Sequence, residues 1–251
     1  MDCPPLPEPF RWEGEHVAAD LPGAGVLFSS RRGGVSPAPF DSLNIGRLTA
    51  DDGVNVDANR ERLAAAVGVP RARFLYGRQV HGTTVRRATE PPGDARPAAD
   101  EDGQVTVLDD VAALVFVADC LPVMLAAEGG VAALHVGYRP LAGGILAEGL
   151  AALRELGAEG PVHAAIGPGA RGCCYEVGEE VHERFAGVPG ARAGERNLDM
   201  PAVARHQLAD AGVEHVYDTG LCTMCRNDLF FSHRADGGTT GRQAGVVWRR
   251  A

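Results

Sequence analysis

Three apolar runs follow one another in the middle of the chain, and they limit the fold more than any other feature of the sequence. They cover residues 112–118, 122–127 and 131–136. Runs of roughly four to eight apolar residues bounded by turn residues are typical of buried strands. A Glu-Gly-Gly turn at 128–130 separates the second run from the third. The sequence therefore predicts central strands, two of which form a hairpin.

Helices and further strands are distributed irregularly along the rest of the chain. Amphipathic spacing predicts a helix over 56–67, with Asn55 as its N-terminal cap, and another helix over 141–156. Because strands and helices do not alternate regularly, we predict an α+β fold with mixed sheets instead of a doubly wound parallel sheet. Further strands are predicted at 24–30, 74–76, 79–85 and 162–166, further helices at 175–185 and 201–211, and a closing hairpin from 229–233 and 243–248.

The length and composition suit a folded protein with one main domain. The chain has 251 residues, of which 45% are hydrophobic and 23% are charged, close to the average for globular proteins. We predict an N-terminal arm over 1–23, followed by a single domain over 24–251. The proline-rich segment 90–103, with its acidic residues at 100–102, is predicted to be a surface loop.

The sequence contains no feature that predicts attachment to a membrane or export. No apolar stretch reaches the roughly 18 residues that a membrane-spanning helix needs. The start of the chain carries acidic residues and prolines, and it lacks the basic start and apolar run of a secretory signal. We therefore expect a cytoplasmic protein that has no membrane partner.

The charged residues restrict both the partners and the chemistry. The formal net charge is −9 and the basic residues are scattered. Binding of nucleic acid requires basic patches that neutralise phosphates, so nucleic acid is not an expected partner. All 24 basic residues are arginine. Reactions that need a lysine nucleophile or a lysine Schiff base are therefore excluded.

Two histidines and one cysteine stand at the ends of predicted strands and are candidates for a metal site. They are His81, Cys120 and His135. Polar groups embedded in apolar surroundings need partners, and zinc accepts imidazole nitrogen and thiolate sulfur. Three protein ligands with one open position is the arrangement of catalytic zinc. The alternative from spacing alone is a pair of ordinary core histidines.

The same residues support a second chemistry. A thiolate that is activated by a neighbouring imidazole is a nucleophile for acyl transfer. Cys120 as nucleophile and His135 as base would make the chain a cysteine hydrolase acting on an amide or a peptidoglycan precursor. Whether His81 converges on the other two residues separates the metal site from the hydrolase.

The remaining cysteines are interpreted as thiols with packing roles. Cys222-x-x-Cys225 is a single pair without a second pair beside it in sequence, which is a weak zinc or redox signal. Cys173 and Cys174 are adjacent, and sequence neighbours do not easily share one metal. We therefore predict small thiols that contribute to packing.

Several strings in the sequence resemble the blocks of one bacterial family. In chain order they are VLFSSRRGGVSPAPFDSLNIG, VDANRERL, FLYGRQVHGTTV, VFVADCLPVMLA, ALHVGYRPLAGGIL, IGPGARGCCYEVGEEV and FFSHRADGGTTGRQAGVVW. The family that they resemble is variously called multicopper polyphenol oxidase, laccase-domain or YfiH-like, and its members are also described as purine nucleoside phosphorylases. The resemblance implies a single catalytic domain with a layered α/β/β/α architecture, and zinc held by His81, Cys120 and His135.

The resemblance also implies a reaction and its substrates. Members of this family would cleave adenosine, inosine or methylthioadenosine with phosphate to the free base and ribose 1-phosphate, with adenosine deaminase as an additional activity. Arg60 and Arg139 are candidates to bind phosphate, because a guanidinium pairs with oxyanions. Asn44 is a candidate hydrogen-bond partner for the base or ribose. Asp119 is the candidate acid and base for the deamination step, in which zinc would activate a water.

Two observations refine this resemblance. Tyr138 and Pro140 replace the tryptophan and the second glycine of the family string HAGWRG, which affects the fit of the substrate. A multicopper oxidase needs His-x-His pairs for its copper cluster, whereas this chain has eight histidines and no such pair. We therefore do not expect polyphenol oxidase activity, although copper can bind to His and Cys ligands in vitro.

Overall fold

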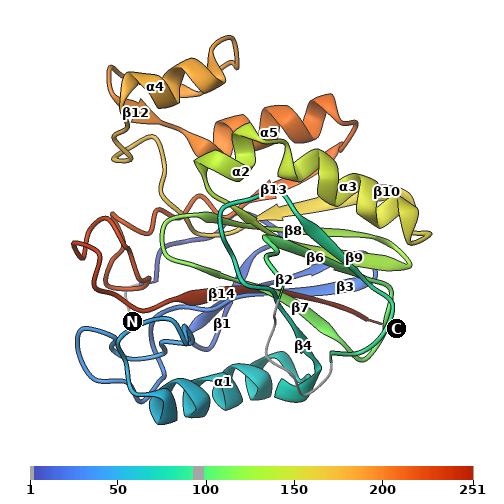
Figure 1. Ribbon diagram of the computed structural model, residues 1–251, viewed down its shortest axis with the longest axis vertical. Coiled ribbons are helices and arrows are strands. Elements are labelled where there is room, and N and C mark those ends of the chain that lie inside the picture. The colour runs from blue at the N-terminus through green and yellow to red at the C-terminus, as the bar shows by residue number, and fades with distance from the viewer. Residues whose placement is uncertain (1–2, 93–98, 251) are drawn as a thin grey trace.

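Two large β-sheets lie face to face, and helices cover the outer side of each sheet (Figure 1). The computed structural model describes residues 3–92 and 99–250. Each large sheet has six strands and contains both parallel and antiparallel pairs. The predicted fold, a layered α/β/β/α domain with mixed sheets, is confirmed. Within the described residues, no helix is both long enough and apolar enough to span a bilayer.

The first sheet contains strands from both the N-terminal and the C-terminal part of the chain. Its strand order is β1-β2-β3-β14-β7-β4. All its pairs are antiparallel except β4 with β7. Because β14 pairs with β3 on one side and with β7 on the other, the C-terminal strand lies in the middle of this sheet. The strands are β1 (Arg11–Glu13), β2 (His16–Leu21), β3 (Ala24–Phe28), β4 (Phe74–Leu75), β7 (Ala112–Val117) and β14 (Gln243–Arg249).

The second sheet contains the hairpin that the apolar runs predicted, and its strand order is β13-β10-β8-β9-β6-β5. Strands β8 and β9 pair antiparallel along their whole length, and Gly129 turns between them with a φ of 84°. The strands are β5 (Val85–Ala88), β6 (Gly103–Thr106), β8 (Leu121–Glu128), β9 (Gly130–Val136), β10 (Glu159–Ile166) and β13 (His215–Asp218). A small separate hairpin consists of β11 (Arg192–Ala193) and β12 (Asn197–Leu198).

Successive side chains along a strand point to opposite faces of the sheet and so pack into two different cores. In β9, Val131 and Ala133 pack between the two sheets, whereas Ala132 and Leu134 pack against the helices of the second sheet. The outer face of the first sheet packs against α1. The helices are α1 (Gly53–Val67), α2 (Tyr138–Ala142), α3 (Ile145–Glu155), α4 (Glu179–His182) and α5 (Met200–Asp210), with short 3-10 turns at Arg71–Arg73 and Glu183–Phe185.

Three helix predictions were wrong in detail, and in one of them, over 175–185, only α4 and the 3-10 turn at Glu183–Phe185 are helical. Asp52 caps α1, because its side chain accepts the backbone N–H of Val54 at 2.9 Å, and Asn55 lies inside the helix. The helix predicted over 141–156 is two helices, α2 and α3. The chain changes direction between them at Gly144, whose φ is 87°, a conformation that suits glycine.

The ends of the chain also differ from the sequence-based expectation. Much of the predicted arm over 1–23 belongs to the first sheet, since β1 and β2 lie in it. The segment 229–233 is not a strand. Instead, the side chain of Gln243 accepts the N–H of Phe231 at 2.7 Å and donates to its carbonyl at 3.1 Å. One buried side-chain amide therefore replaces the backbone ladder of the expected hairpin.

Two of the three acidic residues near the end of the predicted surface loop over 90–103 are buried. Asp102 is fully buried and Glu101 is 7% exposed, because Asp102 accepts hydrogen bonds from the loop that carries His81. Residues 93–98 of this predicted loop lie outside the described residues.

Candidate metal centre

Three donor side chains meet at the place where the chain passes from one sheet to the other. His81 lies in the loop between β4 and β5, Cys120 in the connection from β7 to β8, and His135 near the end of β9. Their imidazole nitrogen and Sγ atoms lie within 4.8 Å of one another. His81 is exposed, Cys120 is half-buried and His135 is buried. The group therefore faces solvent on one side.

The strand register explains why these residues converge. His135 has the same parity along β9 as Val131 and Ala133, whose side chains point between the sheets. Its partner across the ladder is Pro122, so Cys120 lies just beyond the paired end of β8. The apolar run that precedes Cys120 belongs to the first sheet, and the run that follows it belongs to the second. The thiol thus lies where the two layers are joined.

A buried carboxylate orients both histidines. Asp102 Oδ1 lies 2.8 Å from Nδ1 of His135 and accepts the backbone N–H of His81 at 2.9 Å. Asp102 Oδ2 accepts the N–H groups of Val80 and Gly82 at 3.1 Å and 2.7 Å. The contact with Nδ1 leaves Nε2 of His135 as the ring nitrogen that is open to a metal. Sequence reasoning missed Asp102, because three adjacent acids are also what a solvated loop contains.

The thiol and the imidazole stabilise each other as an ion pair. Burial opposes ionisation of Cys120, but the neighbouring His135 and His81 overcome this effect and lower the pKa of the thiol to about 6. Burial likewise opposes protonation of His135, but Cys120 and Asp102 raise the pKa of this imidazole to about 9. Both shifts favour the thiolate and the imidazolium in the metal-free pair, and a cation can replace the imidazolium proton.

The backbone is strained on both sides of the site. His81 has a φ of 60° and Asp119 a φ of 90°, values that residues other than glycine rarely adopt. The buried Asp119 is held by its carboxylate, which accepts the hydroxyl of Thr223 and the backbone N–H of Arg234, each at 2.7 Å. Strain of this kind persists where surrounding contacts enforce it, and it clusters at functional sites.

Two predicted substrate residues lie in the interior of the protein. Asn44 is fully buried; its NH₂ group donates to Thr49 and Asp51, and its oxygen accepts two backbone N–H groups. Arg60, on α1, donates to the carbonyl of Ile45 at 2.9 Å and lies over the ring of Tyr76. These contacts order the loops around α1, and direct binding of substrate by either residue stays a prediction.

Other charged and aromatic groups lie nearer the donor group. Arg139 is exposed at the start of α2, and its guanidinium carbon lies 5.0 Å from the ring centre of Tyr138. Burial, with a smaller effect of the nearby Cys120, raises the pKa of Tyr175 to about 12. Burial lowers the pKa of Arg242, and Cys120 opposes this shift. Sequence reasoning missed Tyr175 and Arg242, whose strings offer no spacing signal.

Gly137 leaves room for the donor group, and this predicts a strong effect of one methyl group. A Cβ on Gly137 would lie 2.8 Å from Cys120 Sγ and 3.2 Å from Cδ2 of His81. We expect Gly137→Ala to lower the metal occupancy of this one donor group by at least about tenfold, because displacing one ligand weakens the whole site. Metal analysis of the purified variant checks this. Gly53→Ala is the control, since its Cβ would meet only the tip of Arg47; equal metal content in both variants would contradict the close approach.

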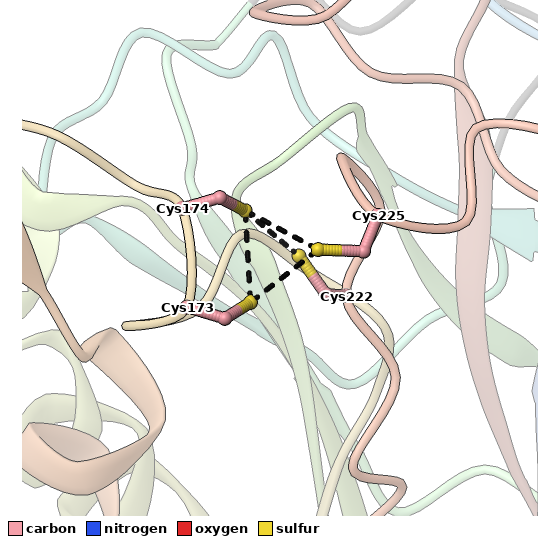
Figure 2. Close-up of side chains that lie close together, drawn as sticks. All are labelled: Cys173, Cys174, Cys222 and Cys225. Carbon is pink, nitrogen blue, oxygen red and sulfur yellow. Dashed lines mark hydrogen bonds between the residues drawn. The ribbon is translucent and has the colours of Figure 1, made fainter.

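The four cysteines from the middle and the end of the chain form one group, which the sequence-based interpretation did not foresee. Cys173, Cys174, Cys222 and Cys225 have their Sγ atoms within 4.8 Å of one another, and their side chains point toward one another (Figure 2). Cys173 and Cys225 are exposed. The prediction of separate small thiols in a packed interior was therefore wrong.

A two-sheet sandwich with two imidazoles and a thiol at the sheet junction defines a single-domain α/β/β/α protein with a site fit for a metal ion. The model of a family described as multi-copper polyphenol oxidoreductase laccase matches residues 25–250. The chain belongs to this family.

Relatives of similar length carry a different functional name. A purine nucleoside phosphorylase of Corynebacterium glutamicum is 39% identical over 230 residues, which cover 88% of this chain and 93% of the relative. The purine nucleoside phosphorylase YfiH of Escherichia coli is 36% identical over 237 residues, which cover 90% and 94%. Among solved structures, YlmD of Geobacillus stearothermophilus has a TM-score of 0.88 at 34% identity, and the match covers 98% of this chain and 100% of that one.

Proposed function

We propose that this chain is a zinc-dependent purine nucleoside phosphorylase. It would convert adenosine, inosine or methylthioadenosine and phosphate to the free base and ribose 1-phosphate, with adenosine deamination as an additional activity. The observation that carries the proposal is the convergence of His81, Cys120 and His135 on one point, in a chain whose near full-length relatives are named purine nucleoside phosphorylases.

The donor group fits zinc in chemistry and in spacing. Ligands about 2.05 Å and 2.3 Å from one tetrahedral ion place a nitrogen and a sulfur about 3.6 Å apart. Nε2 of His81 lies 3.7 Å from Sγ of Cys120. The contact between Asp102 and His135 supplies the supporting carboxylate that zinc-binding histidines usually have. When bound, zinc would supply a Lewis acid that polarises a substrate atom or a water.

Groups around the site would bind and orient the two substrates. We assign phosphate to Arg139, whose exposed guanidinium is available to an oxyanion, and to Arg242, whose charge interacts with Cys120 and Asp119. Tyr138 and Tyr175 are the aromatic faces on which a purine could stack. Asp119 would position Cys120, because both of its carboxylate oxygens already accept hydrogen bonds. A role for Asp119 as acid and base in deamination stays a prediction.

Incubation with nucleosides tests the proposed reaction. We expect adenosine, inosine and methylthioadenosine to release free base only when phosphate is present. Chromatography separates base, sugar phosphate and deaminated nucleoside. Formation of inosine from adenosine without phosphate would reveal the deaminase activity. No change in any nucleoside, with a metal-loaded protein, would overturn the phosphorylase proposal.

Substitution of two different arginines should distinguish an effect on phosphate binding from an effect on stability. Arg139→Ala is expected to raise the KM for phosphate by about tenfold or more, because a charge-assisted hydrogen bond contributes about 1.5–3 kcal/mol. Arg60→Ala should instead lower thermal stability, since Arg60 is 7% exposed and bonded to the carbonyl of Ile45. Phosphate kinetics and melting curves measure the two effects. A normal KM in Arg139→Ala would move the anion site toward Arg242.

The low pKa of Cys120 favours a second candidate function, cysteine hydrolysis of an amide or a peptidoglycan precursor. The thiolate would attack the carbonyl carbon and His135 would transfer the proton to the leaving amine. In metal-free protein, alkylation of Cys120 by iodoacetamide should fall as the pH drops below about 6, because the thiolate is then protonated. If zinc suppresses this alkylation and the zinc-loaded protein converts nucleosides, the hydrolase function is excluded.

A further inference from the structure

The second group of sulfur atoms comes from two loops that are far apart in sequence. Cys173 and Cys174 follow β10, and Cys222 and Cys225 follow β13. Strands β10 and β13 run parallel as neighbours, so both loops leave the same end of the second sheet. An isolated bridge between Gly169 and Cys222 continues this pairing beyond the strands. The parallel pair therefore brings the two cysteine pairs together.

We propose that Cys173, Cys174, Cys222 and Cys225 form a second metal site that holds a structural zinc ion. This site is separate from the donor group of His81, Cys120 and His135, and it goes beyond the proposed reaction. All four side chains point to one central position in Figure 2. Four thiolates without an open position are typical of zinc that stabilises a fold.

The sulfur spacing fits a single ion. Four sulfurs about 2.3 Å from one tetrahedral zinc lie about 3.8 Å apart. Cys174 Sγ lies 3.6, 3.3 and 3.6 Å from the sulfurs of Cys173, Cys222 and Cys225, and the sulfurs of Cys173 and Cys225 are 3.5 Å apart. Small side-chain shifts of a few tenths of an ångström would therefore accommodate the ion.

The arrangement fits zinc better than it fits the alternatives. An iron–sulfur cubane holds its thiolates on four different irons and so keeps them farther apart than one ion does. A disulfide needs one favoured pair, whereas Cys174 Sγ has three sulfur neighbours at nearly equal distances. Hydrophobic packing does not explain the group, because Cys173 and Cys225 are exposed.

The zinc would tie together two loops that both support the first site. Ala170, in the first loop, donates its N–H to the carbonyl of Asp119 at 2.7 Å. Thr223, between the two cysteines of the second loop, donates its hydroxyl to the carboxylate of Asp119 at 2.7 Å. Asp119 precedes Cys120 in the chain. The second ion would therefore act as a positioning element for the strained backbone beside Cys120.

Metal analysis of variants tests this proposal without any activity assay. The double variant Cys173→Ser/Cys225→Ser changes two exposed side chains, so it should still fold. We expect it to contain one zinc per chain fewer than the unchanged protein, when both are purified under reducing conditions. Cys3→Ser is the matched control, since Cys3 belongs to neither donor group, and it should retain the full zinc content.

A spectroscopic test isolates the second site from the first. His81→Ala/Cys120→Ala removes two donors of the first group and should leave one zinc per chain. X-ray absorption at the zinc edge should then show four sulfur neighbours at about 2.3 Å. This measurement does not involve the first site. Its outcome therefore does not depend on whether the protein is a phosphorylase.

Three results would overturn the second site. The first is an unchanged zinc content in Cys173→Ser/Cys225→Ser. The second is a disulfide among these cysteines in reduced, freshly purified protein, seen as a mass 2 Da lower by the loss of two hydrogens. The third is iron with inorganic sulfide in place of zinc, which would show that the thiolates hold a cluster.

Discussion

Replacing Cys120, His81 or His135 singly with alanine is expected to remove the metal from the first site and to lower nucleoside turnover by at least about a thousandfold. The three ligand atoms lie within 4.8 Å of one another, so each is needed for a three-ligand site with one open position. A Lewis acid contributes several kcal/mol to a reaction, and each 1.4 kcal/mol is a factor of ten in rate. Metal content and kcat/KM are measured on the same preparations.

The control for these variants is a histidine that lies on the surface. His206 pairs with Asp210 on α5 at 3.2 Å, and His206→Ala should keep both metal and turnover. The second donor group, with its four cysteines, would retain its zinc in all these variants, so the expected change is one ion per chain. Full metal content in two of the three donor variants would show that the first site lies elsewhere.

Removal of the carboxylate of Asp102 should affect stability and metal binding together. Asp102→Ala leaves the Nδ1 atom of His135 and three backbone N–H groups of residues 80–82 without their acceptor. Each buried group without a partner costs about 1–3 kcal/mol. We expect a loss of about 3 kcal/mol or more, which corresponds to a melting temperature roughly 10 °C lower, and metal affinity reduced by about 10–100-fold.

A nearby acidic residue provides the matched control for Asp102. Asp100 is exposed and pairs with Arg78 at 2.5 Å, and exposed ion pairs contribute about 0–1 kcal/mol. Asp100→Ala should therefore change neither melting temperature nor metal affinity appreciably. Calorimetry and competition with a chelator measure the two quantities. Equal effects of the two substitutions would contradict the orienting role of Asp102.

The central strands could be predicted because their signal is local. The apolar runs at 112–118, 122–127 and 131–136 correspond to β7, β8 and β9. The layered arrangement, by contrast, came from the resemblance to known proteins. The C-terminal hairpin was wrong because Gln243 bonds to Phe231 through its side chain, and hydropathy does not reveal such a contact.

The candidate site was predicted in part for the same reason. His81, Cys120 and His135 stand out because polar groups interrupt or end apolar runs, and the structure brings them together. Asp102 could not be identified, because burial depends on the loop at 80–82 folding over it. Arg60 packs over the ring of Tyr76, a contact of which the sequence contains no sign, and its predicted binding of phosphate stays a prediction.

The sequence by itself determined the mixed class of the fold, the central hairpin and the identity of three donor side chains, because these depend on residue type and on short-range pattern. Only the tertiary structure decided which donors meet. Cys174 and Cys222 are 48 positions apart, and they come together because β10 and β13 pair in parallel. The register of β9 against β8 likewise places His135 beside Cys120. Contacts of this kind follow from strand pairing across long sequence separations, which no local pattern encodes.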